Sequence, residues 1–379
     1  MDFKKKRWIC LIAAMIIDAC TGITYAWSVF VSPLMEQFHC TSQQANLVYT
    51  TMFWCSAIGT LFIVSWAKRN LSINKCVLIG TLVYVLSVIT ASFSTSYWMF
   101  WFFFGVMKSL GAVLVYPVLI SYSVELFPEK SGMSSGLISA GYACGSVIWA
   151  PLANSLMESF GSVTAAIRIL GIIFAICMIP LTFLLRDVPK DFKDLVVAPG
   201  SSIKRKSVDF GFYNVNRNQM IKMGAFYVAL IGLVLAMSGG NMIVSQGAPI
   251  LKDILAFSAA QAASIVAVMS ICNVAGRLAC GVVSDKLGKT KTMALSLIIT
   301  AIAICGMIII RANAVFIGCM LLTVFCYGGQ ASLVAPITAE VFGKEIPACL
   351  IGVHFVRVLW QSAYCIACAY AYFGNNTRL

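Results

Sequence analysis

Two arginines lie in the middle of apolar segments, where a charged side chain needs a reason to be present. Arg277 interrupts the run "VAGRLACGVV", and Arg357 lies within "LIGVHFVRVLW", three residues after His354. Inside a membrane an arginine costs at least about 2.5 kcal/mol, so it must face a cavity or a partner. Guanidinium groups hold carboxylates through paired hydrogen bonds, and two of them suit a small dianion.

Acidic partners for these arginines are scarce in the same part of the chain. Asp253 and Glu340 fall near the ends of apolar segments rather than at mid-depth. We therefore expect Arg277 to be an unpaired cation that receives an anionic ligand; an ion pair with a buried acid is the alternative. His354 lies on the same helical face as Arg357. It is either a packed core residue or a third donor or proton site.

The rest of the chain predicts a membrane protein. Of its 379 residues, 60% are hydrophobic and 11% are charged, against about 25% charged in a typical soluble domain. Apolar runs of about 20 residues recur from end to end, each long enough to cross a hydrocarbon core of roughly 30 Å. The sequence lacks the short alternating segments of a membrane β-barrel. We predict an all-α polytopic protein with about eleven spans, at 8–31, 43–66, 76–95, 98–124, 132–157, 164–185, 219–248, 260–283, 291–310, 314–339 and 347–372.

The net charge of +13 indicates topology rather than a nucleic-acid partner. Most basic residues fall in connections that share a side with the N-terminus. The opposite side holds only Arg168, Lys252, Arg311 and Arg378. By the positive-inside rule, this distribution predicts a cytoplasmic N-terminus. The first apolar run is about 24 residues long, so we interpret it as a retained membrane helix and not as a signal peptide.

A polar linker divides the chain into two related parts. We predict an N-terminal six-helix half at 1–185, a basic cytoplasmic linker at 186–218 and a C-terminal half of about five helices at 219–379. Weak internal similarity supports this division, because "VELFPEK" resembles "AEVFGKE" and "GTLFIVSWAKRN" resembles "GRLACGVVSDKL". The second half is one span short, so we expect a truncated gene product; a functional eleven-helix protein is the alternative.

The loop "GVVSDKLGKTK" at 281–291 resembles the motif G-x-x-x-D-[RK]-x-G-[RK]-[RK] of the major facilitator superfamily of transporters. The matching residues are Gly281, Asp285, Lys286, Gly288 and Lys289. Thr290 departs from the motif, and in the first-half copy Lys68 occupies the place of the aspartate. A gating role therefore rests mainly on the second copy.

Within that superfamily, three further segments resemble the oxalate/formate antiporter group, which is related to the monocarboxylate transporters. These are "GITYAWSVFVSPL", "ELFPEKSGMSSGLISAGYACGSVIWAPL" and "FCYGGQASLVAPITAEVFG". The resemblance implies two pseudo-symmetric six-helix halves around a central site, the last helix being missing here. It also implies that Arg277 in the eighth helix binds a substrate carboxylate. Arg357 stands at or near the place of the second cation, in the eleventh helix.

The same resemblance assigns expectations to other residues. The first and fourth helices of each half line the cavity in this superfamily. Asp18 and Lys108 each stand about ten residues into such a helix, and the opposite helix directions bring them to similar depth. They form either a structural ion pair or a proton-coupling switch. Four aromatic side chains on such helices either surround the carboxylate or simply pack: Tyr25, Trp27, Tyr116 and Tyr327. Glu125 and Glu340 resemble the acids that meet the basic loop motifs at the cytoplasmic gate, where Asp285 caps or pairs.

These observations predict a secondary transporter of small carboxylate anions, most simply of oxalate/formate exchange type, in the cell membrane. A proton-coupled monocarboxylate symporter is the alternative, and a membrane sensor without transport is a third reading. We expect a monomer whose partners are the substrate and the bilayer. No metal or cofactor is expected, because the 15 cysteines and two histidines show no metal-ligand spacing. An enzyme is not expected, since no catalytic set is visible.

Overall fold

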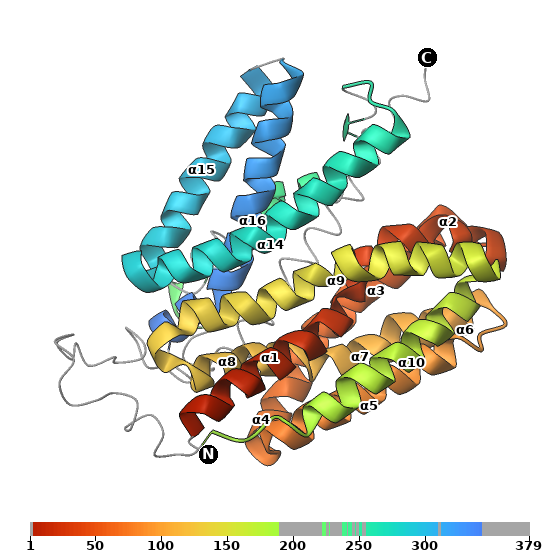
Figure 1. The fold of residues 1–379 in the computed structure, drawn as a ribbon, viewed down its shortest axis with the longest axis horizontal. Coiled ribbons are helices and arrows are strands. Elements are labelled where there is room, and N and C mark those ends of the chain that lie inside the picture. Colours follow the sequence, from red (N-terminus) through yellow and green to blue (C-terminus); the bar gives the residue numbers. More distant parts are fainter. Residues whose placement is uncertain are drawn as a thin grey trace.

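The computed structural model describes residues 3–188, scattered positions between 222 and 258, and residues 259–309 and 312–342. In these parts the regular structure is entirely helical (Figure 1). Within these described residues, eight helical segments are long and apolar enough to span a membrane. The predicted span at 347–372 and most of the one at 219–248 lie outside the described residues.

The first membrane segment is helical throughout but not uniform. It consists of α1 (Phe3–Thr21), the 3-10 turn η1 (Gly22–Ala26) and α2 (Trp27–Phe38). A Cβ on Gly22 would collide with the backbone oxygen of Tyr142, so only glycine lets this segment lie so close to the helix opposite. A 3-10 stretch within a helix often marks a functional hinge. Because of the close approach at Gly22, η1 packs directly against α9.

The remaining helices of the first part follow the predicted apolar runs. They are α3 (Ser42–Gly59), the π-helix η2 (Thr60–Val64), α4 (Ser65–Asn70), α5 (Ile73–Ala91), α6 (Tyr97–Phe100), the π-helix η3 (Trp101–Met107), α7 (Lys108–Val113), α8 (Tyr116–Leu126), η4 (Pro128–Lys130), α9 (Ser131–Phe160) and α10 (Val163–Thr182). Ser96 and Ser162 cap α6 and α10 through their hydroxyl oxygens, which accept backbone N–H bonds. The predicted span 43–66 is helical but is not among the eight candidates. Helical structure covers it from α3 through η2 into α4.

Three long helices make up the described core of the second part. These are α14 (Ala259–Leu287), α15 (Lys289–Ile309) and α16 (Asn313–Phe342), close to the predicted 260–283, 291–310 and 314–339. Ser258 and Gln261 form a capping box at the start of α14. Gly288 has a φ of 91° and ends it, because that conformation suits a residue without a side chain.

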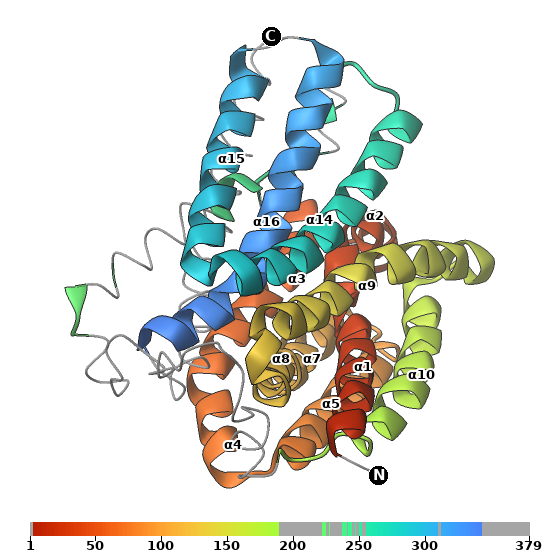
Figure 2. The ribbon, with the colours of Figure 1, turned by 60° about the vertical axis from the view of Figure 1, so that its left-hand side comes forward.

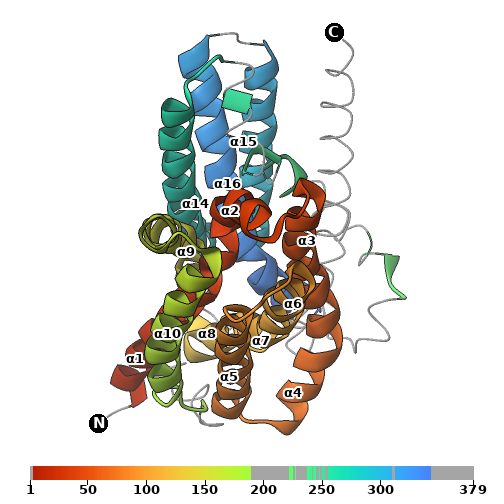
Figure 3. The same ribbon diagram turned by 90° about the vertical axis from the view of Figure 1, so that its right-hand side faces the viewer.

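The two parts bury separate apolar cores. One core consists of side chains between positions 10 and 185, and two smaller clusters come from positions 237–334. In Figures 2 and 3 the helices α14, α15 and α16 stand as a group apart from α1 to α10. The two groups meet where α14 lies against α9. Separate cores are what a two-half architecture needs, while the predicted boundaries at 185 and 219 stay predictions.

Connections predicted to share one side of the membrane do meet at one end of the molecule. Arg7 forms an ion pair with Glu129, the carboxylate of Asp187 accepts from the backbone N–H of Ile73, and Asp285 lies at the same end against the start of α9. We call this the Asp285 end. At the far end, the side-chain oxygen of Gln37 accepts from the backbone N–H of Val163.

Candidate functional site

Arg277 lies at the contact between the two parts of the molecule. It is only 1% exposed, and it stands eight residues before Asp285, about 12 Å along α14. Its Nε donates to Oδ1 of Asn273 at 2.9 Å, and a terminal nitrogen donates to the backbone oxygen of Ser139 at 2.9 Å and to its hydroxyl. Its other terminal nitrogen donates to the hydroxyl of Tyr25 at 3.2 Å. Every one of these acceptors is neutral.

Among the residues that the structure describes, no carboxylate forms an ion pair or hydrogen bond with Arg277, although the buried carboxyl of Asp18 is within electrostatic reach of it. The ion pair found in this part of the chain joins Arg7 to Glu129 and does not involve Arg277. A fully buried cation with only neutral acceptors keeps its attraction for an anion, because hydrogen bonds to uncharged groups do not cancel its charge. The expected ion pair with a buried acid is therefore not formed within the described part of the chain.

Glycines allow Arg277 to reach across to the first part. A Cβ on Gly136 of α9 would lie 2.8 Å from the backbone oxygen of Arg277, and one on Gly132 would lie 2.5 Å from that of Gly281. Small residues at these places let two helices approach closely. The guanidinium of α14 can consequently contact Ser139, one turn along α9 from Gly136.

Three tyrosines from three different elements surround this point. Tyr25 comes from η1, Tyr116 from α8 and Tyr142 from α9. The ring centroids of Tyr25 and Tyr142 are 5.1 Å apart, and those of Tyr116 and Tyr142 are 4.7 Å apart. Tyr116 and Tyr327 of α16 are within electrostatic reach of Arg277. Their hydroxyl groups supply polar atoms, while their rings keep water away from the cation.

Trp27 does not join this group. It is 4% exposed and packs against Phe30 and Phe104, with ring centroids 6.2 Å and 5.9 Å away. Its position in the aromatic core of the first part favours the packing role over contact with a substrate. Residue type and helix position alone could not separate these two roles.

Asp18 and Lys108 are both buried, but the structure does not pair them. Oδ1 of Asp18 accepts from the hydroxyl of Thr21 at 3.0 Å, and Oδ2 has no partner among the described residues. The amine of Lys108 lies 4.2 Å from the ring centroid of Phe104 and 3.7 Å from Sδ of Met52. The expected mutual ion pair is therefore corrected. Lys108 instead lies among the thioether of Met52 and the rings of Phe104 and Tyr84, which come from other helices than Asp18.

The loop motif makes a direct contact between the two parts. Oδ1 and Oδ2 of Asp285 accept from the backbone N–H groups of Gly132 and Met133 at 2.9 and 2.8 Å. These groups belong to the first turn of α9, which has unpaired N–H groups and the positive end of the helix dipole. Asp285 thus caps a helix of the other part.

The other motif residues play different roles. Gly281 packs against Gly132, Gly288 ends α14, and Lys286 and Lys289 lie near the surface. Glu125 is half-buried and forms no ion pair with any described side chain. The acid that meets a basic residue at this end is Glu129, four residues on, which pairs with Arg7.

Several expected site residues cannot be placed. Arg357 and His354 lie outside the described residues, and so does the side chain of Glu340. The second cation of the expected pair therefore stays a prediction.

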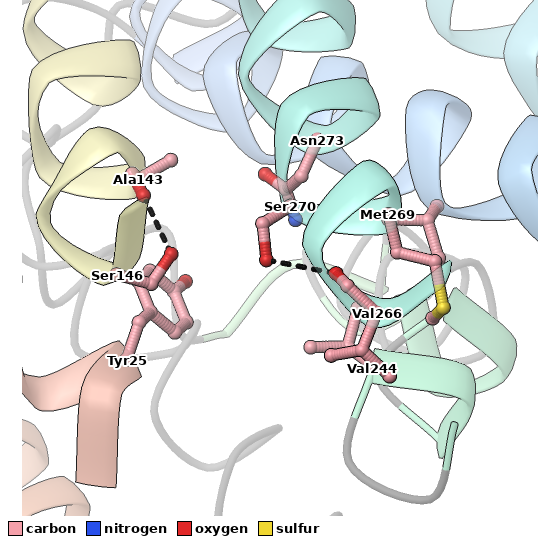
Figure 4. A pocket seen from close by; sticks show the side chains of 9 residues that line it. Tyr25, Ala143, Ser146, Val244, Val266, Met269, Ser270 and Asn273 are labelled. Carbon is pink, nitrogen blue, oxygen red and sulfur yellow. Dashed lines mark hydrogen bonds between the residues drawn. The ribbon is translucent and has the colours of Figure 1, made fainter. Parts of the chain in front are cut away.

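A cavity of about 110 Å³ lies along the part of α14 that precedes Arg277, whereas Asp285 follows it. Figure 4 shows the side chains that line this cavity. Tyr25, Ala143 and Ser146 line it from the first part. The second part contributes Val244, Val266, Met269, Ser270, Asn273 and Val324. Because Asn273 and Tyr25 hydrogen-bond to Arg277 and also line the cavity, they separate the guanidinium from the open space.

These features suit a membrane carrier. The helical fold has two cores, a buried cation lies between them, and the loop motif joins the two parts through hydrogen bonds. The sequence profile described as Major Facilitator Superfamily matches residues 9–367. The chain belongs to the Major Facilitator Superfamily. It is accordingly a multi-pass membrane transporter and not an enzyme.

Curated relatives of this superfamily member match most of the chain at low identity. An MFS-type transporter of Escherichia coli (strain K12), YhjX, is 23% identical, with 90% of this chain and 82% of the relative covered. The oxalate:formate antiporter of Oxalobacter formigenes is 23% identical, over 90% of this chain and 79% of the relative. Monocarboxylate transporter 12-B of Danio rerio is 20% identical, over 91% of this chain and 76% of the relative.

Solved structures of the superfamily share the fold. The proton:xylose symporter XylE, bound to 6-bromo-6-deoxy-D-glucose, superposes with a TM-score of 0.74 at 14% identity, covering 97% of this chain and 91% of that one. A bacterial homologue of the iron transporter ferroportin, in an outward-facing state with soaked iron, reaches a TM-score of 0.70 at 16% identity, covering 98% of this chain and 92% of that one. At such identities the likeness shows the fold alone.

Sequence reasoning missed three residues of this site: Asn273, Ser139 and Tyr142. Asn273 stands four positions before Arg277, the spacing of neighbours on one helical face, so it could have been found. Ser139 and Tyr142 are three apart on α9, within a segment noted in the sequence only for its resemblance to the antiporter group. The contact of Ser139 with Arg277 and those of Tyr142 with Tyr25 and Tyr116 depend on how distant helices pack, which no local pattern determines.

Proposed function

We propose that this transporter carries small organic carboxylate anions, by exchange of the oxalate/formate type. The observation that carries the proposal is the burial of Arg277 among neutral acceptors only. A guanidinium group suits a carboxylate because its planar donors match the two oxygens. The names of the relatives, an oxalate:formate antiporter and a monocarboxylate transporter, support the same substrate class.

The contact of Asp285 with α9 supports an alternating-access mechanism for this transport. At the Asp285 end the two parts are clasped together, while the cavity lies on the opposite side of Arg277. Rocking of one half against the other around a midplane site would release this clasp and open the other side. We assign the Asp285 end to the cytoplasm of the cell membrane, because most basic connections gather there.

The charge of Arg277 supports exchange. The guanidinium is buried here among neutral acceptors, and a carboxylate bound during the passage from one side to the other would lower the cost of burying its charge. Return of the carrier is therefore faster with a second anion bound. Arg357 would supply the other cation for a dianion. We propose that the chain divides into halves at 1–185 and 219–379, so both arginines belong to the second half.

A proton-coupled monocarboxylate symporter is the second candidate function. Asp18 favours it, because this buried carboxyl has an oxygen without a partner among the described residues. A buried carboxyl in that setting is a site where a proton can be taken up. An imposed pH gradient that drives uptake without internal anion would favour this candidate over exchange.

The test is transport by the purified chain in liposomes. Arg277→Gln should abolish uptake of labelled oxalate, formate and lactate into anion-loaded vesicles, whereas Arg277→Lys should retain part of it. Arg168→Gln is the matched control, because Arg168 bonds to Ser92 at the far end and should transport normally. Carboxylate exchange that persists undiminished in Arg277→Gln would contradict the proposal.

A further inference from the structure

Asn273 has one side of its amide occupied by Arg277 and the other side free. A guanidinium group only donates, so Asn273 must present its oxygen to Nε of Arg277. This contact determines the amide orientation and turns the NH2 group away from the cation. No acceptor for that NH2 group occurs among the residues that the structure describes.

Tyr25 is arranged in the same way. Its hydroxyl oxygen accepts from Arg277 at 3.2 Å, which leaves its own proton to be donated elsewhere. Among the described residues no acceptor for that proton is recorded. Both residues therefore have an acceptor atom held by a buried cation and a donor left over. A cation on the acceptor side polarises such groups and strengthens their donors.

The two donors meet at the cavity described above. Asn273 and Tyr25 line it from opposite parts of the molecule, together with the hydroxyl-bearing Ser146 and Ser270. In Figure 4 these last two hydroxyls point to backbone oxygens of their own helices, at Ala143 and Val266. Among the described residues that line the cavity, the free donors are thus those of Asn273 and Tyr25.

The size and walls of the cavity limit what can be held there. A volume of about 110 Å³ has room for about three or four water-sized groups. Valine, methionine and alanine residues form the remaining walls. A compact anion of few atoms fits, while a bulky or strongly cationic molecule does not.

We propose that this cavity is an outer subsite for the carboxylate, where the amide NH2 of Asn273 and the hydroxyl of Tyr25 bind the anion before it reaches Arg277. The inference rests on the proposed function and adds a binding step to it. The anion then displaces the amide of Asn273 and the hydroxyl of Tyr25 from the guanidinium. Both side chains stay bound to the anion as it moves to Arg277. Asn273 is consequently a substrate-binding residue and not only a support for Arg277.

The experiment is calorimetric titration of the purified full chain in nanodiscs with sodium oxalate and sodium formate. Loss of a hydrogen bond to a charged ligand weakens binding by about tenfold or more, so Asn273→Ala should raise the Kd by at least about that factor. Val266→Phe should do the same by filling the cavity without touching Arg277. Val268→Phe is the matched control, because Val268 is 45% exposed on the same helix, and its Kd should equal that of the unsubstituted chain.

Each outcome has a separate meaning. Normal binding in Val266→Phe or in Asn273→Ala would overturn the outer subsite, even if Arg277→Gln binds nothing. Failure of the unsubstituted chain to bind any carboxylate would instead overturn the proposed function. Size-exclusion profiles and melting temperatures identify variants that do not fold, and the smaller Val266→Leu then replaces Val266→Phe.

Discussion

At the scale of single residues, the site combines a buried cation with neutral acceptors that can be exchanged for an anion. The N–H groups of Arg277 donate hydrogen bonds to Ser139 and Asn273. The side chains of three tyrosines surround this point. An aspartate in place of Asn273 would have cancelled the charge permanently. The neutral amide holds the guanidinium in place and leaves its attraction for a carboxylate intact.

Lys108 is a second buried cation, and its substitution gives a residue-scale prediction. Burial of an ammonium group costs several kcal/mol, which contact with Phe104 offsets only in part. Lys108→Met should therefore raise the free energy of unfolding in detergent by about 1–3 kcal/mol. The exposed Lys130→Met serves as control and should leave it unchanged. A lower stability of Lys108→Met would show that Lys108 meets an acid outside the described residues.

At the scale of elements, the close approach of α9 and α14 decides whether the site exists. Gly132 and Gly136 on α9 face the backbone of Gly281 and Arg277 on α14. The side chain of Arg277 reaches Ser139 only at this separation. A helix pair held further apart would leave the guanidinium without these acceptors.

Gly136→Ala tests this packing. The added Cβ would lie 2.8 Å from a backbone oxygen, so α9 and α14 must separate and the site loosens. Carboxylate exchange should fall at least about tenfold, in line with the 1–3 kcal/mol cost of overpacking. Gly318→Ala, on α16 with nothing within 4 Å of its added Cβ, should retain full activity in the same transport assay. Equal activity of the two variants would exclude a role for the close approach.

At the scale of the whole molecule, two separately packed parts are joined by the hydrogen bonds of Asp285 and meet around the buried Arg277. Asp285 holds the start of α9 through two hydrogen bonds, and the cavity lies beyond Arg277. Because each part has its own core, one can rotate against the other without unfolding. The conformation described here is closed at the Asp285 end.

Asp285→Asn should shift this equilibrium. The charge-assisted hydrogen bonds and the interaction with the helix dipole are each worth about 1 kcal/mol, so the ratio of closed to open molecules should fall at least about tenfold. The measurement is alkylation of Ser135→Cys in inside-out vesicles, because Ser135 is buried between the parts. Labelling should become faster than in the control Asp187→Asn, whose contact with Ile73 lies within the first part. Unchanged labelling would show that other contacts hold this end closed.

Much of this architecture could be predicted from the order of the residues. The membrane class, the helices around 73–91, 131–160 and 259–287, and the importance of Arg277 follow from hydropathy and the cost of a buried charge, which are local properties. The partners of Arg277, the separation of Asp18 from Lys108 and the packing of Trp27 could not be predicted. They depend on the rotation and distance of helices far apart in the chain, and those are decided only when every helix finds its neighbours.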